Sequence, residues 1–344
     1  MRHADPDTPQ ISLIVPVYNC ERYLPDQLDA LLSDCAMRME VIAVDDGSRD
    51  GSMAILQAYG ARDARLRIFG QPHVGQSAAR NAGLQAARGT WVAFADADDI
   101  LPAAALAAWF QQAVAQNLDV LIGNGYRFTQ SPPPAVSTPL LARQPFGRTM
   151  TGQDWVKHCV DNGEWPHYVC LQVIKRELIT RHALAFDPSM LHEDILWTTE
   201  LALVAKRIGF AREPVYGYRR NPDSTTLSPS PQIRRWRGES YVRIIETLLA
   251  LSLRQDLERG TRVAIARHVL HEVLCLVDLL RKDIECPQTR ARLARSTLRL
   301  RAWPRLLRHA RGARDLRRLL KAYWRLRRMA RADTPVATDV AASQ

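Results

Sequence analysis

Three carboxylates fall within four positions at the end of a short apolar run, in the stretch Asp96-Ala97-Asp98-Asp99. Acidic groups held this close repel one another, which destabilises a fold unless a cation or hydrogen-bond donors lie among them. The cluster therefore indicates that at least one of these carboxylates holds a hard divalent cation, because such ions prefer oxygen ligands. The alternative is that Asp99 caps a helix that begins after Pro102, although one cap needs only one aspartate.

Polar and aromatic residues also follow two other apolar runs, which end in Pro16-Val17-Tyr18-Asn19 and in Asp45-Asp46-Gly47-Ser48. Ligands of open α/β sheets bind beyond the carboxyl ends of the strands, so we expect these groups to converge with the acids at 96–99 on one crevice. A ring for a base and carboxylates for base edges and ribose hydroxyls would suit a nucleotide. In the alternative, Asp46-Gly47 is an ordinary turn and Tyr18 a core residue. No G-x-G-x-x-G or P-loop motif occurs, which disfavours those two nucleotide folds.

The elements that must position these groups alternate between short apolar runs and helical patterns. This order is typical of an α/β domain with a Rossmann-like, mostly parallel sheet and flanking helices. Strands are expected at 11–17, 40–44, 66–69, 91–95, 118–122, 164–175 and 210–218. Helices are expected at 26–33, 52–59, 76–88, 103–116, 151–161, 176–182 and 190–206. The proline-rich segment 129–150 has no periodicity, and it predicts a loop suited to a mobile lid.

Positive charge is concentrated in the C-terminal part of the sequence. The chain has a formal charge of +11, but residues 286–331 hold 15 Arg and one Lys against a single acid, Asp315. That segment carries a net +15, which leaves the rest of the chain at −4. Its pattern is helical from residue 233, with helices expected at 236–253 and 263–280 and an Arg-rich stretch broken at Pro304. Such a basic region suits nucleic acid or an anionic membrane surface, and composition does not choose between them.

The last helical stretch has the pattern of an amphipathic basic helix. Its apolar residues on one face are Leu316, Leu319, Leu320, Tyr323 and Leu326. The residues that flank this face are Arg314, Arg317, Arg318, Arg325 and Arg328. One interpretation is docking on an anionic inner leaflet, and the other is a helix packed on the catalytic domain with a solvated Arg face.

Nothing in the sequence predicts a membrane-spanning or secreted protein. No uninterrupted run of about 18 apolar residues occurs, and residues 1–10 lack the apolar core of a secretion signal. The six cysteines include no C-x-x-C pair, so no zinc site is expected. We therefore expect a cytoplasmic protein, peripheral on the inner face of the membrane if the basic helices dock there.

Five motifs in this order and spacing resemble the family-two glycosyltransferases of the GT-A fold, over roughly residues 10–225. They are Pro16-Val17-Tyr18-Asn19, Val44-Asp45-Asp46-Gly47-Ser48, Gly75-Gln76-Ser77-Ala78-Ala79-Arg80-Asn81, Asp96-Ala97-Asp98-Asp99 and His192-Glu193-Asp194. The resemblance implies a metal-dependent, hexosyltransferase-like enzyme that uses a nucleotide-sugar donor and inverts the anomeric carbon by direct displacement. At the family level it implies a role in bacterial envelope polysaccharide or lipopolysaccharide synthesis.

The resemblance also implies roles for individual residues. Tyr18 would contact the nucleobase, Asp45 or Asp46 the uracil or ribose, and Asp96 the ribose. Asp98 would be the main ligand of a divalent cation, Mn²⁺ or Mg²⁺, with Asp96 beside it. The full set of donor-binding candidates is Pro16, Val17, Tyr18, Asn19, Glu21, Asp45, Asp46, Gly75, Ser77, Arg80, Asn81, Asp96, Ala97, Arg219 and Arg220.

An acceptor hydroxyl that attacks an anomeric carbon must lose a proton, which requires a base. By analogy with the family this base is Asp194, with Glu193 as the second candidate. In the alternative both acids merely favour the start of a helix, where the helix dipole would lower their pKa. Arg80 and one of Arg219 and Arg220 would offset charge on the diphosphate, whereas Arg80 could also lie on a solvated helix face.

We expect a GT-A catalytic domain at residues 11–228, followed by a helical basic region at 229–332. The terminal segments 1–10 and 333–344 are expected to be disordered. Within the catalytic domain, about 11–125 would bind the donor and about 150–228 the acceptor, a saccharide or a lipid-linked molecule. The runner-up functions are a sugar-1-phosphate nucleotidyltransferase, which usually has a Gly-rich phosphate loop, and a non-catalytic basic module. We expect no nucleic-acid partner, and a homo-oligomer is compatible with the sequence.

Overall fold

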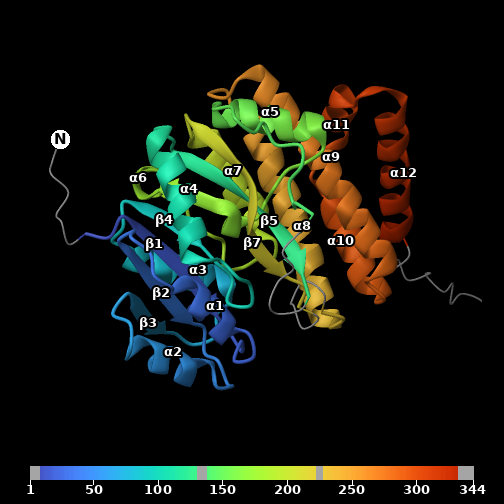
Figure 1. Ribbon diagram of the computed structural model, residues 1–344. Helices are drawn as coiled ribbons and strands as arrows, with labels where there is room; N and C mark the ends of the chain where they lie inside the picture. Colours follow the sequence, from blue (N-terminus) through green and yellow to red (C-terminus); the bar gives the residue numbers. More distant parts are fainter. Residues whose placement is uncertain (1–7, 130–137, 222–227, 332–344) are drawn as a thin grey trace, which may run out of the picture. The chain divides into compact units, whose positions relative to one another are not determined.

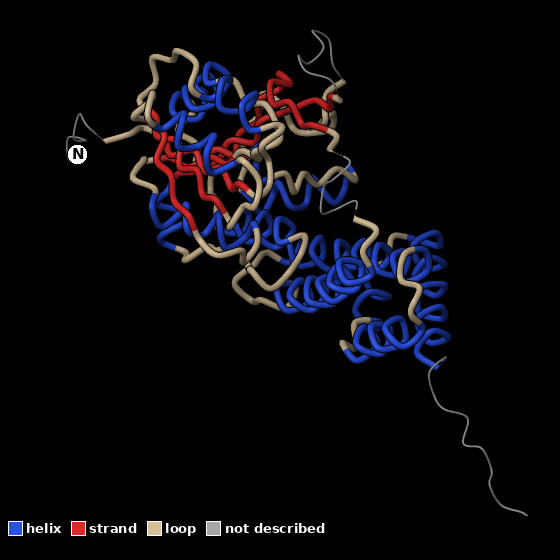
Figure 2. The backbone as a smooth tube through the Cα atoms, turned by 90° about the horizontal axis from the view of Figure 1, so that it is seen from below, coloured by secondary structure: helices blue, strands red, loops and turns tan. Residues whose placement is uncertain are grey.

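A seven-stranded sheet organises the N-terminal two thirds of the chain (Figure 1). The computed structural model describes residues 8–129, 138–221 and 228–331. The strand order is β3-β2-β1-β4-β6-β5-β7, and only β6 runs antiparallel to its neighbours. Helices lie on both faces of the strands (Figure 2). This architecture confirms the predicted α/β fold with a mostly parallel sheet.

The elements of this part follow the predicted alternation. The strands are β1 (Ile11–Val17), β2 (Met39–Asp45), β3 (Leu66–Gly70), β4 (Trp91–Phe94), β5 (Val120–Phe128), β6 (Gln172–Lys175) and β7 (Ile208–Arg219). The helices are α1 (Leu24–Leu31), α2 (Ser52–Gly60), α3 (Gln76–Ala86), α4 (Ala103–Ala115), α5 (Gly152–Asn162), the 3₁₀ turn η1 (Val169–Leu171), α6 (Arg176–Arg181) and α7 (Glu193–Val204).

Three neighbouring strands explain why the chemical groups meet. Every residue of β1, β2 and β4 is buried, as expected of central parallel strands covered on both faces. The register pairs Val17 with Asp45, and Ile14 with Phe94. The carboxyl ends of the three strands therefore lie side by side, and the residues that follow them share one edge of the sheet.

An aromatic cluster joins the end of β4 to α7. Phe186 stacks on Trp197 with ring centroids 4.0 Å apart, and Phe94 meets both rings edge-on at 5.4 and 5.8 Å. Phe94 lies two positions before Asp96, and Trp197 lies three positions after Asp194. This packing holds the acid cluster and the predicted base on one rigid support.

Two sequence expectations are corrected here. The strand expected at 164–175 is wrong over most of its length, because only Gln172–Lys175 pairs in the sheet and Val169–Leu171 forms a 3₁₀ turn. The alternative interpretation of Asp99 as a helix cap is also wrong, since α4 begins after Pro102 without any side-chain cap. Of the predicted lid, residues 138–150 contain only isolated bridges, and 130–137 lie outside the described residues.

The chain splits into two compact units, Met1–Ser189 with Glu193–Asp223, and Met190–His192 with Ser224–Gln344. The second unit is helical, and its helices are α8 (Pro231–Leu251), α9 (Arg259–Lys282), α10 (Pro287–Arg299), α11 (Trp303–His309) and α12 (Gly312–Arg331). The predicted break is present, with Pro304 in the first turn of α11. The tails predicted to be disordered fall on residues outside the described ones, apart from 8–10.

None of the helices in the described part of the chain is both long enough and apolar enough to cross a membrane.

Candidate active site

The edge of the site beyond β1 carries a stacked pair of rings. Tyr18 is 38% exposed and lies parallel to the imidazole of His73, with centroids 3.9 Å apart. Next to it, Asn19 has a φ of 49° and accepts a hydrogen bond at Oδ1 from the Arg49 amide. Tyr18 is therefore not a core residue, and its ring and that of His73 offer an exposed aromatic surface.

The two aspartates after β2 have different environments. Asp46 is buried, and its carboxylate accepts hydrogen bonds from Gln71 Nε2 at 2.7 Å and from the amides of Val74 and Gly75 at 3.0 and 2.8 Å. It also pairs with His73 Nδ1 at 2.8 Å. Asp46 thus holds its own chain between β3 and α3.

Asp45 retains an oxygen that its own chain does not use. Its Oδ2 accepts a hydrogen bond from the Ser48 amide at 3.1 Å. Its Oδ1 is buried without a partner among the described residues. Of the two sequence candidates, Asp45 is the one able to accept a hydrogen bond from a ligand.

Several other candidate residues support the backbone of the site. The Glu21 carboxylate accepts a hydrogen bond from the Gly51 amide at 2.6 Å, and Asn81 makes two bonds with the backbone of Phe186. Gly75 has a φ of 107° with open space beside its α-carbon, which leaves room for a ligand. The buried remainder of the candidate set consists of Pro16, Val17, Ser77 and Ala97.

The acid cluster after β4 splits into one structural and two available carboxylates. Asp99 accepts hydrogen bonds from the Tyr216 hydroxyl at 2.6 Å and the Arg219 amide at 2.7 Å, so it ties the end of β4 to β7. Burial and the neighbouring charge of Asp96 raise the pKa of Asp98. The Asp98 Oδ2 accepts one hydrogen bond, from Asn221. The repulsion expected from the sequence is therefore present at Asp98.

Arg80 connects the acid cluster with the acids that open α7. Its guanidinium donates to Asp96 Oδ1 at 3.0 Å and to Glu193 Oε1 at 2.6 Å, and it lies 5.3 Å from the Phe186 ring centroid. Arg80 is only 5% exposed, so the solvated helix face considered for it is wrong. Burial alone would lower its pKa, but the charges of Asp96, Glu193 and Asp194 raise it. The Arg80 guanidinium therefore stays charged, and its two salt bridges hold Asp96 and Glu193 close together.

Asp194 is held apart from this ion pair. Burial, and then the charge of Glu193, raise its pKa to about 7, although Arg80 acts in the opposite direction. Its Oδ1 is buried and has no hydrogen-bond partner among the residues described. A carboxylate with this pKa and a free oxygen can take up a proton near neutral pH.

The two arginines at the end of β7 differ in burial and in the contacts of their side chains. Arg219 is buried, donates to the Asp98 carbonyl at 2.6 Å and pairs with Asp26 at 3.0 Å. Arg220 is exposed. Arg220 is therefore the better candidate for an anionic ligand. Residues 222–227, which follow it closely, lie outside the described part of the chain.

Sequence reasoning missed four residues of this site. Gln76 donates to Asp96 at 3.0 Å, and His73 stacks on Tyr18. Both residues follow β3. They could have been found from the sequence, because ligands of α/β sheets bind beyond the carboxyl ends of the strands. The rings of Tyr168 and Tyr218 meet edge to face with centroids 6.0 Å apart. Burial raises the pKa of both hydroxyls, and the charge of Asp194 adds to this at Tyr168 and that of Asp96 at Tyr218. No spacing pattern marks these two tyrosines.

The donor atoms here fit a hard divalent cation. Asp96, Asp99 and Cys170 have potential ligand atoms within 4.8 Å of one another in the described part of the chain. Burial and the charge of Asp96 raise the pKa of Cys170 well above its usual value, so it stays a neutral thiol. Asp98 lies outside this group. Both oxygens of Asp99 already accept hydrogen bonds from β7, whereas the hydrogen bonds from Gln76 and Arg80 reach only Oδ1 of Asp96.

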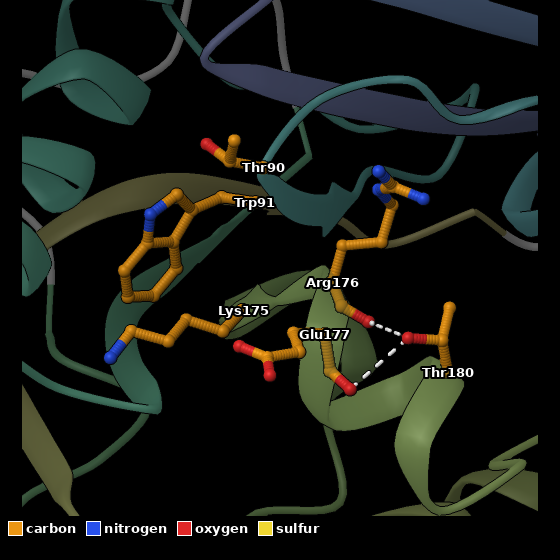
Figure 3. A pocket seen from close by; sticks show the side chains of 6 residues that line it. All are labelled: Thr90, Trp91, Lys175, Arg176, Glu177 and Thr180. Carbon is orange, nitrogen blue, oxygen red and sulfur yellow. Dashed lines mark hydrogen bonds between the residues drawn. The ribbon is translucent and has the colours of Figure 1, made fainter. Parts of the chain in front are cut away.

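A separate pocket lies away from this site, where β4 begins and β6 ends (Figure 3). It is lined by Thr90, Trp91, Lys175, Arg176, Glu177 and Thr180. Its polar groups are largely satisfied, since Arg176 donates to the Gly89 carbonyl and Thr180 to the carbonyls of Arg176 and Glu177. It is not part of the candidate active site.

Comparison with known proteins gives consistent results. Residues 12–166 match the family described as glycosyl transferase family 2. The uncharacterized glycosyltransferase EpsJ of Bacillus subtilis is 32% identical over 274 residues, which cover 77% of each chain.

Two solved structures have the same fold at low sequence identity. S. aureus TarS 1–349 in complex with UDP-GlcNAc has a TM-score of 0.62 at 20% identity, covering 93% of this chain and 92% of that one. The mannosyltransferase PcManGT from Pyrobaculum calidifontis, in complex with GDP-Man and Mn²⁺, has a TM-score of 0.55 at 15% identity, covering 94% and 87%.

Proposed function

Because the chain belongs to glycosyltransferase family 2 and has the GT-A fold expected from its sequence, we propose that it transfers a sugar from a nucleotide-sugar donor to an acceptor hydroxyl. In this proposal the donor is a UDP-sugar, and the acceptor is a saccharide or a lipid-linked molecule. The observation that carries the proposal is the double contact of Arg80, which joins Asp96 to Glu193. It brings carboxylates suited to a nucleotide and a metal next to an acid suited to be the base. We assign catalysis to the α/β unit, because all these residues belong to it.

Asp194 takes the role of general base. As the acceptor oxygen attacks the anomeric carbon, its proton passes to Asp194, and the bond from that carbon to the phosphate oxygen breaks. A single displacement of this kind inverts the anomeric carbon. The pKa of about 7 makes the carboxylate a stronger base than an ordinary aspartate while leaving it largely ionised above neutral pH.

Glu193 and Arg80 prepare this base without touching the reacting atoms. Arg80 forms a salt bridge with Glu193 at 2.6 Å, which holds the Glu193 carboxylate beside Asp194. Burial, and then the charge of Glu193, raise the pKa of Asp194. Glu193 is therefore a positioning residue in this proposal, and Asp194 the catalytic one.

Asp98 and Asp96 would hold a divalent cation, Mn²⁺ or Mg²⁺. When bound, such an ion supplies positive charge next to the diphosphate of the donor. The chain adds Arg220, whose exposed position at the end of β7 suits a phosphate contact. The Mn²⁺ in the PcManGT structure supports this assignment.

The nucleotide half of the donor would lie along β1 and β2. The rings of Tyr18 and His73 give the base an aromatic surface, and Asp45 Oδ1 gives it or the ribose an acceptor. The TarS complex with UDP-GlcNAc supports a UDP-sugar as donor. A role in envelope polysaccharide or lipopolysaccharide synthesis is proposed at the level of the family.

The test is release of nucleoside diphosphate from a panel of donors, UDP-GlcNAc, UDP-glucose and GDP-mannose, by the full-length protein with Mn²⁺, Mg²⁺ or a chelator. We expect one donor to be hydrolysed slowly in a cation-dependent reaction, with water in place of the acceptor. Release of pyrophosphate from a nucleoside triphosphate and a sugar phosphate would instead identify the nucleotidyltransferase. Turnover of no donor under any of these conditions would count against the proposal.

A further inference from the structure

The C-terminal helix α12 has two separate apolar faces. The helix packs against α9, α10 and α11 of its own unit (Figure 1), and the residues of its buried face are Leu319, Ala322 and Leu326. A second set is exposed: Leu316 by 40%, Leu320 by 44% and Trp324 by 62%. These three residues recur every fourth position, so they form one stripe along the helix surface, the Leu-Trp stripe. The single apolar face expected from the sequence is therefore divided, and Trp324 joins its exposed part.

A row of cations borders the Leu-Trp stripe. The cationic row consists of Arg314, Arg317, Arg318, Lys321, Arg325 and Arg328. At 3.6 residues per turn, these positions follow the stripe around the side of the helix that faces away from the buried face. None of the six forms a salt bridge within the part of the chain that the structure describes. The one acid of the segment, Asp315, accepts a bond from the Arg311 amide.

This combination fits an anionic bilayer surface better than the other anionic or apolar partners. The phosphates of nucleic acid would pair with the cations, but nucleic acid has no apolar surface that would bury the two leucines and the tryptophan of the stripe. A second copy of the chain would cover the stripe, but it would bring its own unpaired cationic row against the first. A bilayer interface accepts Leu and Trp below its headgroups while anionic headgroups neutralise the cations.

We propose that the Leu-Trp stripe and the cationic row dock α12 on an anionic lipid surface, with the helix axis in the plane of the membrane. This inference goes beyond the proposed function and does not depend on it, because it concerns lipid binding by the helical unit. If both hold, the acceptor reached by the enzyme is one that is present at that surface, such as a lipid-linked saccharide.

The test is co-sedimentation of the full-length protein with vesicles of phosphatidylcholine alone and of an equal mixture with phosphatidylglycerol. We expect binding to the mixture only, weakening as salt rises, because the attraction is screened over about 8 Å at physiological ionic strength. A variant carrying Arg317→Gln, Lys321→Gln and Arg328→Gln should bind on the order of 100-fold more weakly, since each cation near the surface contributes about fivefold. A variant carrying Leu320→Ser and Trp324→Ser should lose at least about tenfold.

Matched variants separate these effects from charge and apolar surface in general. Arg62→Gln, Arg148→Gln and Lys206→Gln remove three exposed cations from the other unit and should leave binding unchanged. Val114→Ser with Leu253→Ser removes side chains that are 49% and 56% exposed elsewhere, with the same expectation. Thermal unfolding and donor hydrolysis of every variant show that the fold and the active site are retained.

Three outcomes would overturn the proposal. Binding to phosphatidylcholine alone as tight as to the mixture would remove the charge argument. Equal loss of binding in the control variants would remove the assignment to α12. Binding of duplex DNA or formation of a dimer that the α12 variants abolish, without any vesicle binding, would assign the surface to those partners.

Discussion

The surroundings of the Asp194 carboxyl group raise its pKa, whereas its position in the sequence predicts a lowered pKa. As the second residue of α7 it should have a lowered pKa, because a helix N-terminus favours negative charge. Burial and the neighbouring Glu193 outweigh this and raise the pKa to about 7. The sequence supplied the position, but the sign of the shift depends on residues brought together only by folding.

A pH dependence of activity follows from this shift. The base must be ionised, so turnover should rise about tenfold per pH unit below 7 and level off above it. Asp194→Asn should lower turnover by at least about 100-fold with donor affinity nearly unchanged. Steady-state rates from pH 5 to 9 and titration of the donor by calorimetry measure both quantities.

The same shift has a consequence for stability, with the sign fixed by linkage. A carboxyl group whose pKa is raised in the folded state favours folding when protonated, and this contribution is lost as pH rises from its unfolded value through about 7. Asp194→Asn should therefore unfold at the same or higher temperature than the wild type at pH 8. Loss of donor affinity along with the rate would place Asp194 in the donor site and make Glu193 the better candidate base.

Asp98 gives a second prediction at the residue scale. Burial and the charge of Asp96 raise its pKa, so its ionised form is disfavoured unless a cation is bound. Asp98→Asn removes that repulsion and the metal ligand together, so it should abolish cation-dependent turnover without lowering the free energy of unfolding. Rates with added Mn²⁺ and urea denaturation test this, and full turnover of the variant would remove the metal assignment.

Asp45 and Asp46 form a matched pair for a third prediction. Asp46→Asn replaces an acceptor of several hydrogen bonds with an amide that carries its own donors, so it should destabilise the fold by about 1–3 kcal/mol. Asp45→Asn should change the free energy of unfolding by no more than about 0.5 kcal/mol and should instead weaken binding of the donor. Urea denaturation and donor titration of both variants distinguish the roles, and the reverse pattern would exchange them.

The motif residues are a case where the sequence predicts the location but not the use. Their order along the chain predicted that the groups after β1, β2 and β4 would meet, because parallel strands end at one edge. It did not predict that Asp46, Asp99 and Arg219 would be bonded to their own chain, since those partners lie in distant segments. Tyr168 and Tyr218 were missed for the same reason.

At the scale of elements, α5 packs closely on α7, the helix that carries the proposed base. A β-carbon added at Gly152, the first residue of α5, would lie 1.7 Å from the Ala202 carbonyl oxygen in α7. Gly152→Ala must therefore push the two helices apart, and it should lower the free energy of unfolding by roughly 1–3 kcal/mol and reduce turnover. Thermal unfolding and the donor-hydrolysis rate measure the two effects.

Gly70 provides the control for that substitution. A β-carbon there would meet only Met53 Cε at 3.5 Å, which is an ordinary contact. Gly70→Ala should thus leave both stability and turnover close to those of the wild type. An equally mild effect of Gly152→Ala would mean that α7 does not depend on α5 for its position.

The central strands were predictable and the segment before β6 was not. Ile11–Val17 is buried throughout and apolar at every position except Ser12, which is a strong local signal. The residues from 164 to 171 have strand-like composition, but Trp165, His167 and Tyr168 lie in irregular backbone before a 3₁₀ turn. Composition alone cannot distinguish a strand from an aromatic loop whose side chains find tertiary partners.

For the whole molecule, the distribution of charge and burial limits how the chain can be divided. The +15 of residues 286–331 suggests removing that segment to isolate its role. The structure argues against this, because Leu293, Leu306, Leu319 and Leu326 are buried and α10 and α12 pack on α8 and α9. Surface substitutions on α12 are therefore the sound way to test the basic region.

The two compact units should also respond differently to the donor. All the proposed donor and metal contacts belong to Met1–Ser189 and Glu193–Asp223. A donor at 100 times its dissociation constant, bound with Mn²⁺, should stabilise that unit by about 2.7 kcal/mol. Hydrogen exchange should accordingly slow in β1, β2, β4 and the start of α7, and it should be unchanged in α8 to α12. The full-length protein with Mn²⁺ and free UDP serves as the control for the nucleotide half, and protection confined to the helical unit would move the donor site out of the α/β unit.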